Sequence, residues 1–202
     1  MTGKDYNDKK WDVVVILPIK SGDDFEMEAV LRVGELMAIS ARTAPKARGV
    51  DDIEVALIYG EEKEKLAEQM QRIGEMTGLP QFKRDAEGVR GAHAVLLVGV
   101  RGTNPLGLNC GMCGFRSCDE YSKAKKIDTG GVRGPLCAFK LLDLGIAVGS
   151  AVKTASIHNV DNRVMITVGI AARMMKLLKN SDVILGIPIV AAGKNPFFDR
   201  KT

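Results

Sequence analysis

The chain has 202 residues, of which 46% are hydrophobic and 27% are charged, close to the averages of globular proteins, so an intrinsically disordered chain is excluded. Its formal net charge is only +4 and aromatic residues make up only 5%, which argues against nucleic-acid binding. No apolar run approaches the roughly 20 residues that cross a bilayer. Residues 1–10 are polar and lack a signal-peptide core, so we expect a cytoplasmic protein with no membrane contact.

Strand and helix patterns alternate in the first half of the chain. The β-branched run Val13–Leu17 predicts a strand, and the next pattern predicts a helix that is capped by an aspartate at 23 or 24 and ends near Ala44. A strand is predicted over Ile53–Tyr59, and a helix over Glu61–Met76 that ends before a glycine and a proline. The almost wholly apolar run His93–Val100 predicts a central strand.

The second half supports an α+β fold. Leu136–Ala155 predicts a buried helix, whereas residues 162–178 fit a strand at their start and a helix at their end. Val183–Val190 predicts a last strand, placed at a sheet edge because it contains Pro188. We therefore expect one α+β domain over residues 1–202, with a mixed or antiparallel sheet flanked by helices and a cysteine segment, residues 101–137, inserted after the central strand.

All four cysteines of the chain lie in that segment. Their spacing is Cys110-x2-Cys113-x4-Cys118-x18-Cys137. A compact loop of this kind supplies three thiolates, and a more distant cysteine supplies the fourth that an iron–sulfur cube needs. Glycines after the first two cysteines let the backbone turn tightly and point N–H groups at sulfur. The spacing predicts one [4Fe–4S] cluster on these four residues.

Two alternatives for the cysteines stay open. Structural zinc sites usually pair two short knuckles, and this chain has only one such pair, Cys110 and Cys113. Redox-active disulfides or unligated thiols are the other alternative. The function is thus predicted as an iron–sulfur redox protein, with a non-enzymatic electron carrier or accessory protein and a structural zinc-binding module as rival hypotheses. Its partner would be a redox protein or a small-molecule electron acceptor.

Two resemblances concern the cluster and the chain as a whole. The run Cys110-Gly-Met-Cys-Gly-Phe-Arg-Ser-Cys118, with Cys137 following, resembles a small 4Fe–4S domain of electron-transfer and corrinoid-linked proteins from anaerobes, although its last gap is slightly long. The whole chain resembles an uncharacterised prokaryotic family described as containing a ferredoxin domain (DUF2148-like). The matching segments are residues 41–46, the cysteine run, 144–147 and 193–200.

A third resemblance concerns the scaffold. The segments at 40–46, 61–67, 143–147 and 185–188 are similar to FMN-dependent nitroreductases, which implies a homodimer with flavin at the subunit interface. The Asn and the Gln-Pro-Trp run expected after the first helix are replaced by Lys46-Ala-Arg-Gly49. Arg42, Lys46 and Arg48 are candidates for contacts to an FMN phosphate; the alternative is a basic helix end that complements the helix dipole. An oxidoreductase is consistent with this resemblance, but no catalytic residue is predicted.

Overall fold

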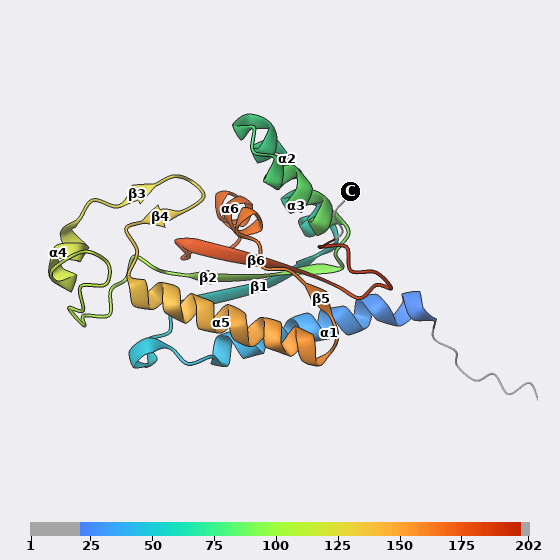
Figure 1. The fold of residues 1–202 in the computed structure, drawn as a ribbon, viewed down its shortest axis with the longest axis horizontal. Coiled ribbons are helices and arrows are strands. Elements are labelled where there is room, and N and C mark those ends of the chain that lie inside the picture. The colour runs from blue at the N-terminus through green and yellow to red at the C-terminus, as the bar shows by residue number, and fades with distance from the viewer. Residues whose placement is uncertain (1–20, 199–202) are drawn as a thin grey trace, which may run out of the picture.

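The computed structural model of the chain describes residues 21–198, so the predicted strand Val13–Leu17 lies outside the described residues. Four longer helices, two short helices and a 3-10 turn alternate with six strands in this part of the chain (Figure 1). In chain order the elements are α1 (Gly22–Thr43), η1 (Ala47–Gly49), β1 (Ile53–Tyr59), α2 (Gly60–Thr77), α3 (Pro80–Arg90), β2 (Ala94–Val100), α4 (Cys118–Lys123), β3 (Ile127–Asp128), β4 (Arg133–Gly134), α5 (Ala138–Ile157), β5 (Asp161–Asn162), α6 (Ile166–Met174) and β6 (Val183–Val190).

The main sheet has the strand order β1-β2-β6-β5, and every neighbouring pair is antiparallel. Strand β2 lies between β1 and β6, and all seven of its residues are buried. A strand that is covered on both faces needs apolar side chains at every position. The predicted central strand and the predicted α+β class with an antiparallel sheet are both confirmed.

The edge position predicted for β6 is corrected. The strand lies between β2 and β5, although β5 pairs only with Ile189 and Val190. The carbonyl of Pro188 accepts from the N–H of Arg163 on the β5 side. In a strand the N–H and C=O of one residue point to the same side. Because the carbonyl of Pro188 faces β5, the lack of an N–H at this proline costs a hydrogen bond only on the β5 side, and the long ladder with β2 stays complete.

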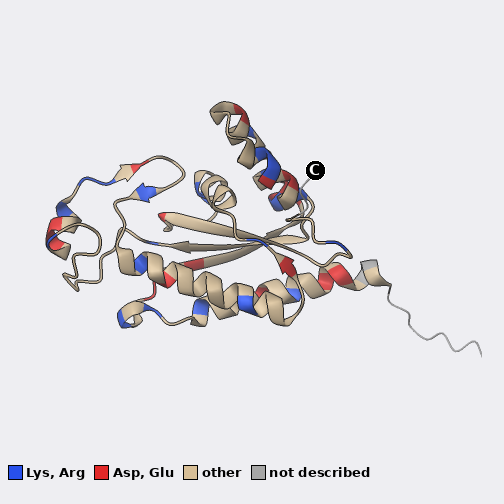
Figure 2. Cartoon of the chain, in the orientation of Figure 1, with Lys and Arg blue, Asp and Glu red and all other residues tan. Residues whose placement is uncertain are grey.

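Helices cover both faces of the sheet. Alternate residues of β2 divide between two cores: Leu96 and Val98 pack with α1 and α5, whereas Val95 and Leu97 pack with α2, α3 and α6. Figure 1 shows α1 and α5 together below the sheet and α2, α3 and α6 above it. Charged residues are concentrated on the helices and loops and largely absent from the central strands (Figure 2).

Two glycines let helices approach the sheet closely. A Cβ at Gly34 of α1 would lie 2.8 Å from a methyl group of Leu57, and a Cβ at Gly169 of α6 would lie 1.7 Å from the carbonyl oxygen of Ile184. Gly34 therefore serves packing, although within the sequence it weakens a helix pattern. No helix within residues 21–198 is both long and apolar enough to span a membrane.

Two segments differ from what the local pattern predicts. Pro80 follows the end of α2, but it also occupies the first turn of a second helix, α3, where a proline is tolerated because that N–H has no helical partner. In the ambiguous stretch, the strand is limited to β5 and the helical pattern prevails from Ile166 to Met174.

Candidate metal centre

The four cysteines lie on a long excursion that leaves the end of β2 and returns at the start of α5. Figure 1 shows this segment, with α4, β3 and β4, extending beyond one end of the sheet. All four thiols are free, and their burial increases along the chain: Cys110 is exposed, Cys113 and Cys118 are partly buried, and Cys137 is buried. The four side chains line one pocket, together with apolar residues that include Leu106, Phe115 and Phe139.

Left-handed backbone shapes the loop that holds the first three cysteines. Gly111 and Gly114 have φ of 73° and 85°, and Gly114 N–H donates to the carbonyl of Gly111 at 2.9 Å, which closes a tight turn. Asn109 also has a positive φ, of 49°. Its side-chain oxygen accepts from Cys118 N–H at 2.8 Å, and its own N–H lies 3.4 Å from Cys118 Sγ. The loop is thus closed on itself between Asn109 and Cys118.

Two helix starts present Cys118 and Cys137. Ser117 caps α4, where its hydroxyl accepts from Glu120 N–H at 3.1 Å, and Cys118 is the first residue of that helix. Cys137 directly precedes α5, and its N–H donates to the carbonyl of Gly102 at 2.8 Å. The start of the segment therefore holds the fourth cysteine in place beside the loop that carries the other three.

Tyr121 of α4 packs in the interior of this segment, a role that the sequence did not predict. Its side chain is fully buried, and its hydroxyl donates to the carbonyls of Gly102 at 3.2 Å and Pro135 at 2.8 Å. Burial, followed by the negative charges of Cys137 and Cys113, raises the pKa of Tyr121 to about 12. The phenol is therefore a neutral hydrogen-bond donor at physiological pH.

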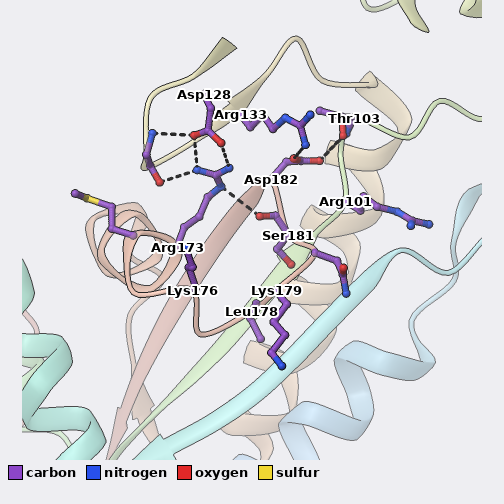
Figure 3. Close-up of a pocket in the computed structure, with 13 residues that line it drawn as sticks. Arg101, Thr103, Asp128, Arg133, Arg173, Lys176, Leu178, Lys179, Ser181 and Asp182 are labelled. Atoms are coloured by element: carbon purple, nitrogen blue, oxygen red, sulfur yellow. Dashed lines mark hydrogen bonds and ion pairs between the residues drawn. The ribbon is translucent and has the colours of Figure 1, made fainter. Parts of the chain in front are cut away.

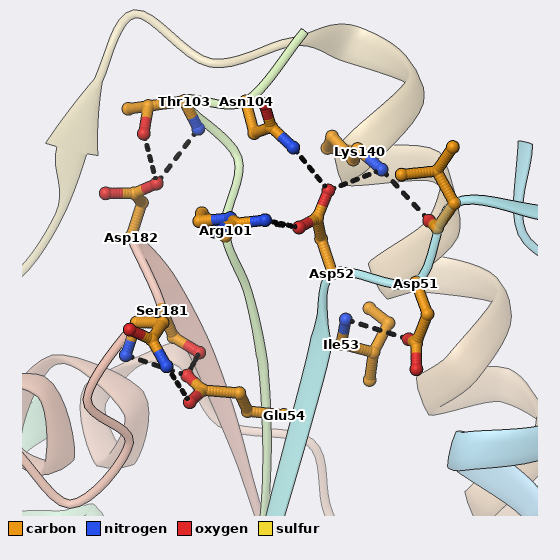
Figure 4. A network of polar contacts seen from close by, with 12 residues as sticks. Asp51, Asp52, Ile53, Glu54, Arg101, Thr103, Asn104, Lys140, Ser181 and Asp182 are labelled. Carbon is orange, nitrogen blue, oxygen red and sulfur yellow. Dashed lines mark hydrogen bonds and ion pairs between the residues drawn. The ribbon is translucent and has the colours of Figure 1, made fainter. Parts of the chain in front are cut away.

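A buried ionic network surrounds Lys140, three residues after Cys137 in the sequence (Figure 4). Lys140 Nζ lies 2.8 Å from Asp52 Oδ2, and Asp52 also accepts from Arg101 Nε at 2.9 Å and from Asn104 Nδ2 at 3.0 Å. Burial alone would raise the pKa of Asp52, but the hydrogen bonds from Lys140, Asn104 and Arg101 outweigh it and lower the pKa below its ordinary value.

Asp143 completes the network from the next turn of α5. Its Oδ1 accepts from Ala47 N–H at 2.8 Å, which holds η1 against the helix. Its Oδ2 lies 3.9 Å from Lys140 Nζ and makes no hydrogen bond, and among the described residues it is the one buried side-chain polar atom without a partner. Neither Asp143 nor Lys140 had a sequence signal, because both occur within an otherwise apolar helix pattern.

The donor set of the cysteine pocket suits an iron–sulfur cluster. Four thiols are present, and no charged side chain lines the pocket beside them. The open space between them is about 10 Å³, room for about one water molecule. A cluster is larger than this space, so the pocket would have to widen to hold one. Within residues 21–198, no three His, Cys, Asp or Glu side chains form a group that would hold a single metal ion.

The three basic residues considered for flavin phosphate lie around the end of α1. Arg42 forms an ion pair with Asp51 and also donates to the carbonyl of Ile53. Lys46 Nζ donates to the carbonyl of Ala44 at 3.0 Å. Arg48, with a positive φ of 55°, donates to the carbonyl of Leu106 at 3.0 Å. Each cation has acceptors within the chain, and Arg48 ties η1 to the cysteine segment.

Comparisons with known proteins agree with the architecture. A family model described as "uncharacterized protein containing a ferredoxin domain (DUF2148)" matches residues 133–200, which include Cys137 but not the other three cysteines. A protein from Archaeoglobus fulgidus that is described as uncharacterized is 47% identical over 177 residues, which cover 88% of this chain and 95% of the relative.

Solved structures with a similar fold are nitroreductases and an FMN-containing oxidoreductase. Nitroreductase CinD from Lactococcus lactis, solved with nicotinic acid, is 11% identical, with a TM-score of 0.56 over 87% of this chain and 82% of that one. The oxidoreductase that contains FMN is 15% identical, with a TM-score of 0.50 over 81% and 67%. The chain spans only 61% of nitroreductase A from Vibrio parahaemolyticus, where it covers 84% of its own length with a TM-score of 0.49 and 12% identity. At these identities the likeness concerns the fold alone.

With the archaeal relative matched over nearly its whole length, the chain belongs to the DUF2148 family of proteins that contain a ferredoxin domain, and its fold is nitroreductase-like.

Proposed function

We propose that this chain is a redox protein that holds one [4Fe–4S] cluster on Cys110, Cys113, Cys118 and Cys137. The observation that carries the proposal is the single pocket lined by all four thiols, which come from a glycine-rich loop and from the start of α5. When bound, the cluster would supply one-electron transfer. The residues of the chain hold it, shield one side of it and compensate its charge.

The surroundings of the thiols support an anionic centre. Four thiolates and an oxidised cube core leave a charge of about −2. Asn109 N–H already points at Cys118 Sγ, and hydrogen bonds of this kind stabilise the reduced state. Lys126 lies over the ring of Tyr121, 3.8 Å from its centroid, and donates to the carbonyl of the same residue at 2.6 Å. This fixes one positive charge close to the cluster site.

Metal analysis of protein purified without oxygen tests the proposal. We expect a brown protein with broad absorbance near 400 nm, about four iron atoms per chain and matching acid-labile sulfide. Cys113→Ala should lose the iron while retaining the far-ultraviolet circular dichroism of the wild type, because the thiol lies on an exposed loop. A colourless protein that contains zinc and no sulfide would contradict the cluster and support the zinc module.

FMN is the second cofactor that we propose, on the basis of the nitroreductase-like fold and the FMN-containing oxidoreductase that shares it. With flavin the chain would be an oxidoreductase; without it, an electron carrier. Arg42, Lys46 and Arg48 remain the predicted phosphate contacts, and they would have to exchange their present acceptors for the phosphate. Denaturation should release flavin fluorescence in a fixed ratio to chain, and its absence from protein reconstituted with FMN would favour the carrier.

We also propose that the chain forms a homodimer through α1 and α5. These helices cover one face of the sheet, and apolar side chains remain exposed on their outer sides, including Leu36 and Ile39 on α1 and Leu142, Ile146 and Ile157 on α5. Exposed apolar patches of this kind mark protein contacts. Light scattering should give twice the chain mass, and Ile146→Asp should halve it. Met76→Asp at the exposed end of α2 is the control, and a monomeric wild type would contradict the proposal.

A further inference from the structure

A basic basin is partly lined by the cysteine segment, although none of the four cysteines lines it. It has a volume of about 780 Å³ and is lined by residues of the loop after β2, the β3–β4 hairpin and the turn between α6 and β6. Small-molecule sites commonly measure about 300–1,000 Å³. Five of its lining side chains are cationic and two are acidic, an excess of three positive charges. The cationic residues are Arg101, Arg133, Arg173, Lys176 and Lys179.

Both acidic side chains accept hydrogen bonds from other residues that line the basin. Asp128 accepts from Arg173 through two parallel contacts of 2.8 Å, and Arg173 also donates to the carbonyl of Gly130 at 2.6 Å. Asp182 Oδ2 accepts from the N–H and the hydroxyl of Thr103 at 2.9 and 2.7 Å. Figure 3 shows Arg173 and Arg133 beside these carboxylates and Arg101 directed away from them. Arg173 therefore neutralises Asp128, and Asp182 faces Arg133, so the net charge of the lining remains positive.

Two lysines of the basin have no partner in the described chain. Lys176 and Lys179 are exposed, and the ammonium group of neither makes a hydrogen bond or ion pair with any of residues 21–198. Arg133 is only loosely engaged, with its guanidinium 3.8 Å from Asp182. Lys176 and Lys179 therefore carry positive charge that the described chain does not itself neutralise, and Arg133 adds a third cation from a separate segment.

The backbone at Lys176 is a second, independent indication. The residue follows Met175, the C-cap of α6, and has a φ of 58°. Its N–H donates to the carbonyl of Arg173, and the N–H of Leu177 donates to the carbonyl of Ala172. This helix ending strongly favours glycine, because a side chain is strained there. A lysine at such a position costs stability, and strain of this kind is concentrated at functional sites.

The basin and the cysteine pocket share a wall. The carbonyl of Gly102 accepts from Cys137 N–H and Tyr121 on one side, while the next residue, Thr103, donates to Asp182 on the other. We propose that the basin binds a small molecule that carries a multivalent oxyanion, such as a phosphate ester, and that Lys176, Lys179 and Arg133 hold it. The proposal stands on the basin alone and does not require the cluster.

Titration calorimetry with inorganic pyrophosphate tests this at constant ionic strength, on protein of measured iron content. We expect saturable binding by the wild type and a loss of affinity of about tenfold or more in Lys176→Gly and Lys179→Ala, the worth of one charge-assisted contact. Lys176→Gly should keep or raise the melting temperature, since glycine relieves the strain. Lys83→Ala on α3 removes an equal charge outside the basin and should bind like the wild type.

Two results would overturn the proposal. One is the absence of saturable binding by the wild type, and the other is equal weakening in Lys83→Ala, which would reduce the effect to net charge. If Lys176→Gly failed to fold, Lys179→Ala would still decide. Because iron is measured on the same sample, failure of the cluster assignment and failure of anion binding give different results.

Discussion

The ammonium group of Lys140 lies 2.8 Å from the carboxylate of Asp52, and neither side chain exposes more than 2% of its surface. Asp52 also receives Arg101 and Asn104 from the start of the cysteine segment. Lys140 follows the end of that segment, and its N–H donates to the carbonyl of Cys137 at 3.0 Å. One buried ion pair therefore braces both ends of the excursion that carries the thiols.

Removing one partner of this ion pair should strongly lower the free energy of unfolding. Lys140→Met leaves the buried carboxylate of Asp52 with the half-exposed Arg101 as its remaining cation, and breaking a buried pair in this way costs up to about 3–5 kcal/mol. Urea unfolding of the metal-free protein measures the loss. Lys65→Ala, which removes an exposed pair with Glu62, should change the free energy of unfolding little, because solvent screens such a pair. Equal effects of the two variants would show that the buried pair does not brace the fold.

The lowered pKa of Asp52 predicts how the free energy of unfolding changes at low pH. The pKa of Asp52 is lower in the folded chain than in the unfolded one, so its stabilising contribution is fully present above the unfolded pKa of about 3.9. That contribution is lost as the pH falls through the lower, folded pKa. In Asp52→Asn the free energy of unfolding should fall less steeply with decreasing pH below about 4 than in the wild type. Identical slopes would contradict the assignment.

Local sequence patterns predicted the strands well, but they did not predict the contacts between segments that lie far apart in the sequence. Ile53–Tyr59 has the predicted bounds because its β-branched and apolar run is followed at once by a glycine. Helix α3 was missed because a proline both ends one helix and opens the next, and only the fold decides which. The cysteine spacing predicted that the four thiols belong together, and the structure places them around one pocket.

The partners of that site could not be predicted. Asp52 and Lys140 come from distant parts of the sequence, and an isolated charge in an apolar helix has no pattern that names its partner. Tyr121 is one of three tyrosines, and only the fold brings its hydroxyl to Gly102 and Pro135. The basic basin likewise combines separate segments, each of which resembles an ordinary solvated surface in the sequence.

The phenol of Tyr121 should resist titration. Its pKa is about 12 in the folded chain and about 10 in an unfolded one. Folding therefore gains stability from the neutral phenol below pH 10, and this gain is lost as the pH rises through the folded pKa. Absorbance at 295 nm should show one tyrosine that ionises only near pH 12, and Tyr121→Phe should remove that step. If the late step persisted in Tyr121→Phe, another tyrosine would be the buried one.

A matched pair of glycine substitutions tests the close packing of α6. In Gly169→Ala the new methyl group would lie 1.7 Å from the carbonyl oxygen of Ile184 in β6, so the helix must move, at a cost of more than about 3 kcal/mol. In Gly145→Ala the methyl group meets nothing within 4 Å, and alanine favours a helix by up to about 1 kcal/mol. Thermal unfolding should separate the two variants widely and in opposite directions from the wild type. If Gly169→Ala melted with the wild type, α6 would not lie against β6 as closely as described.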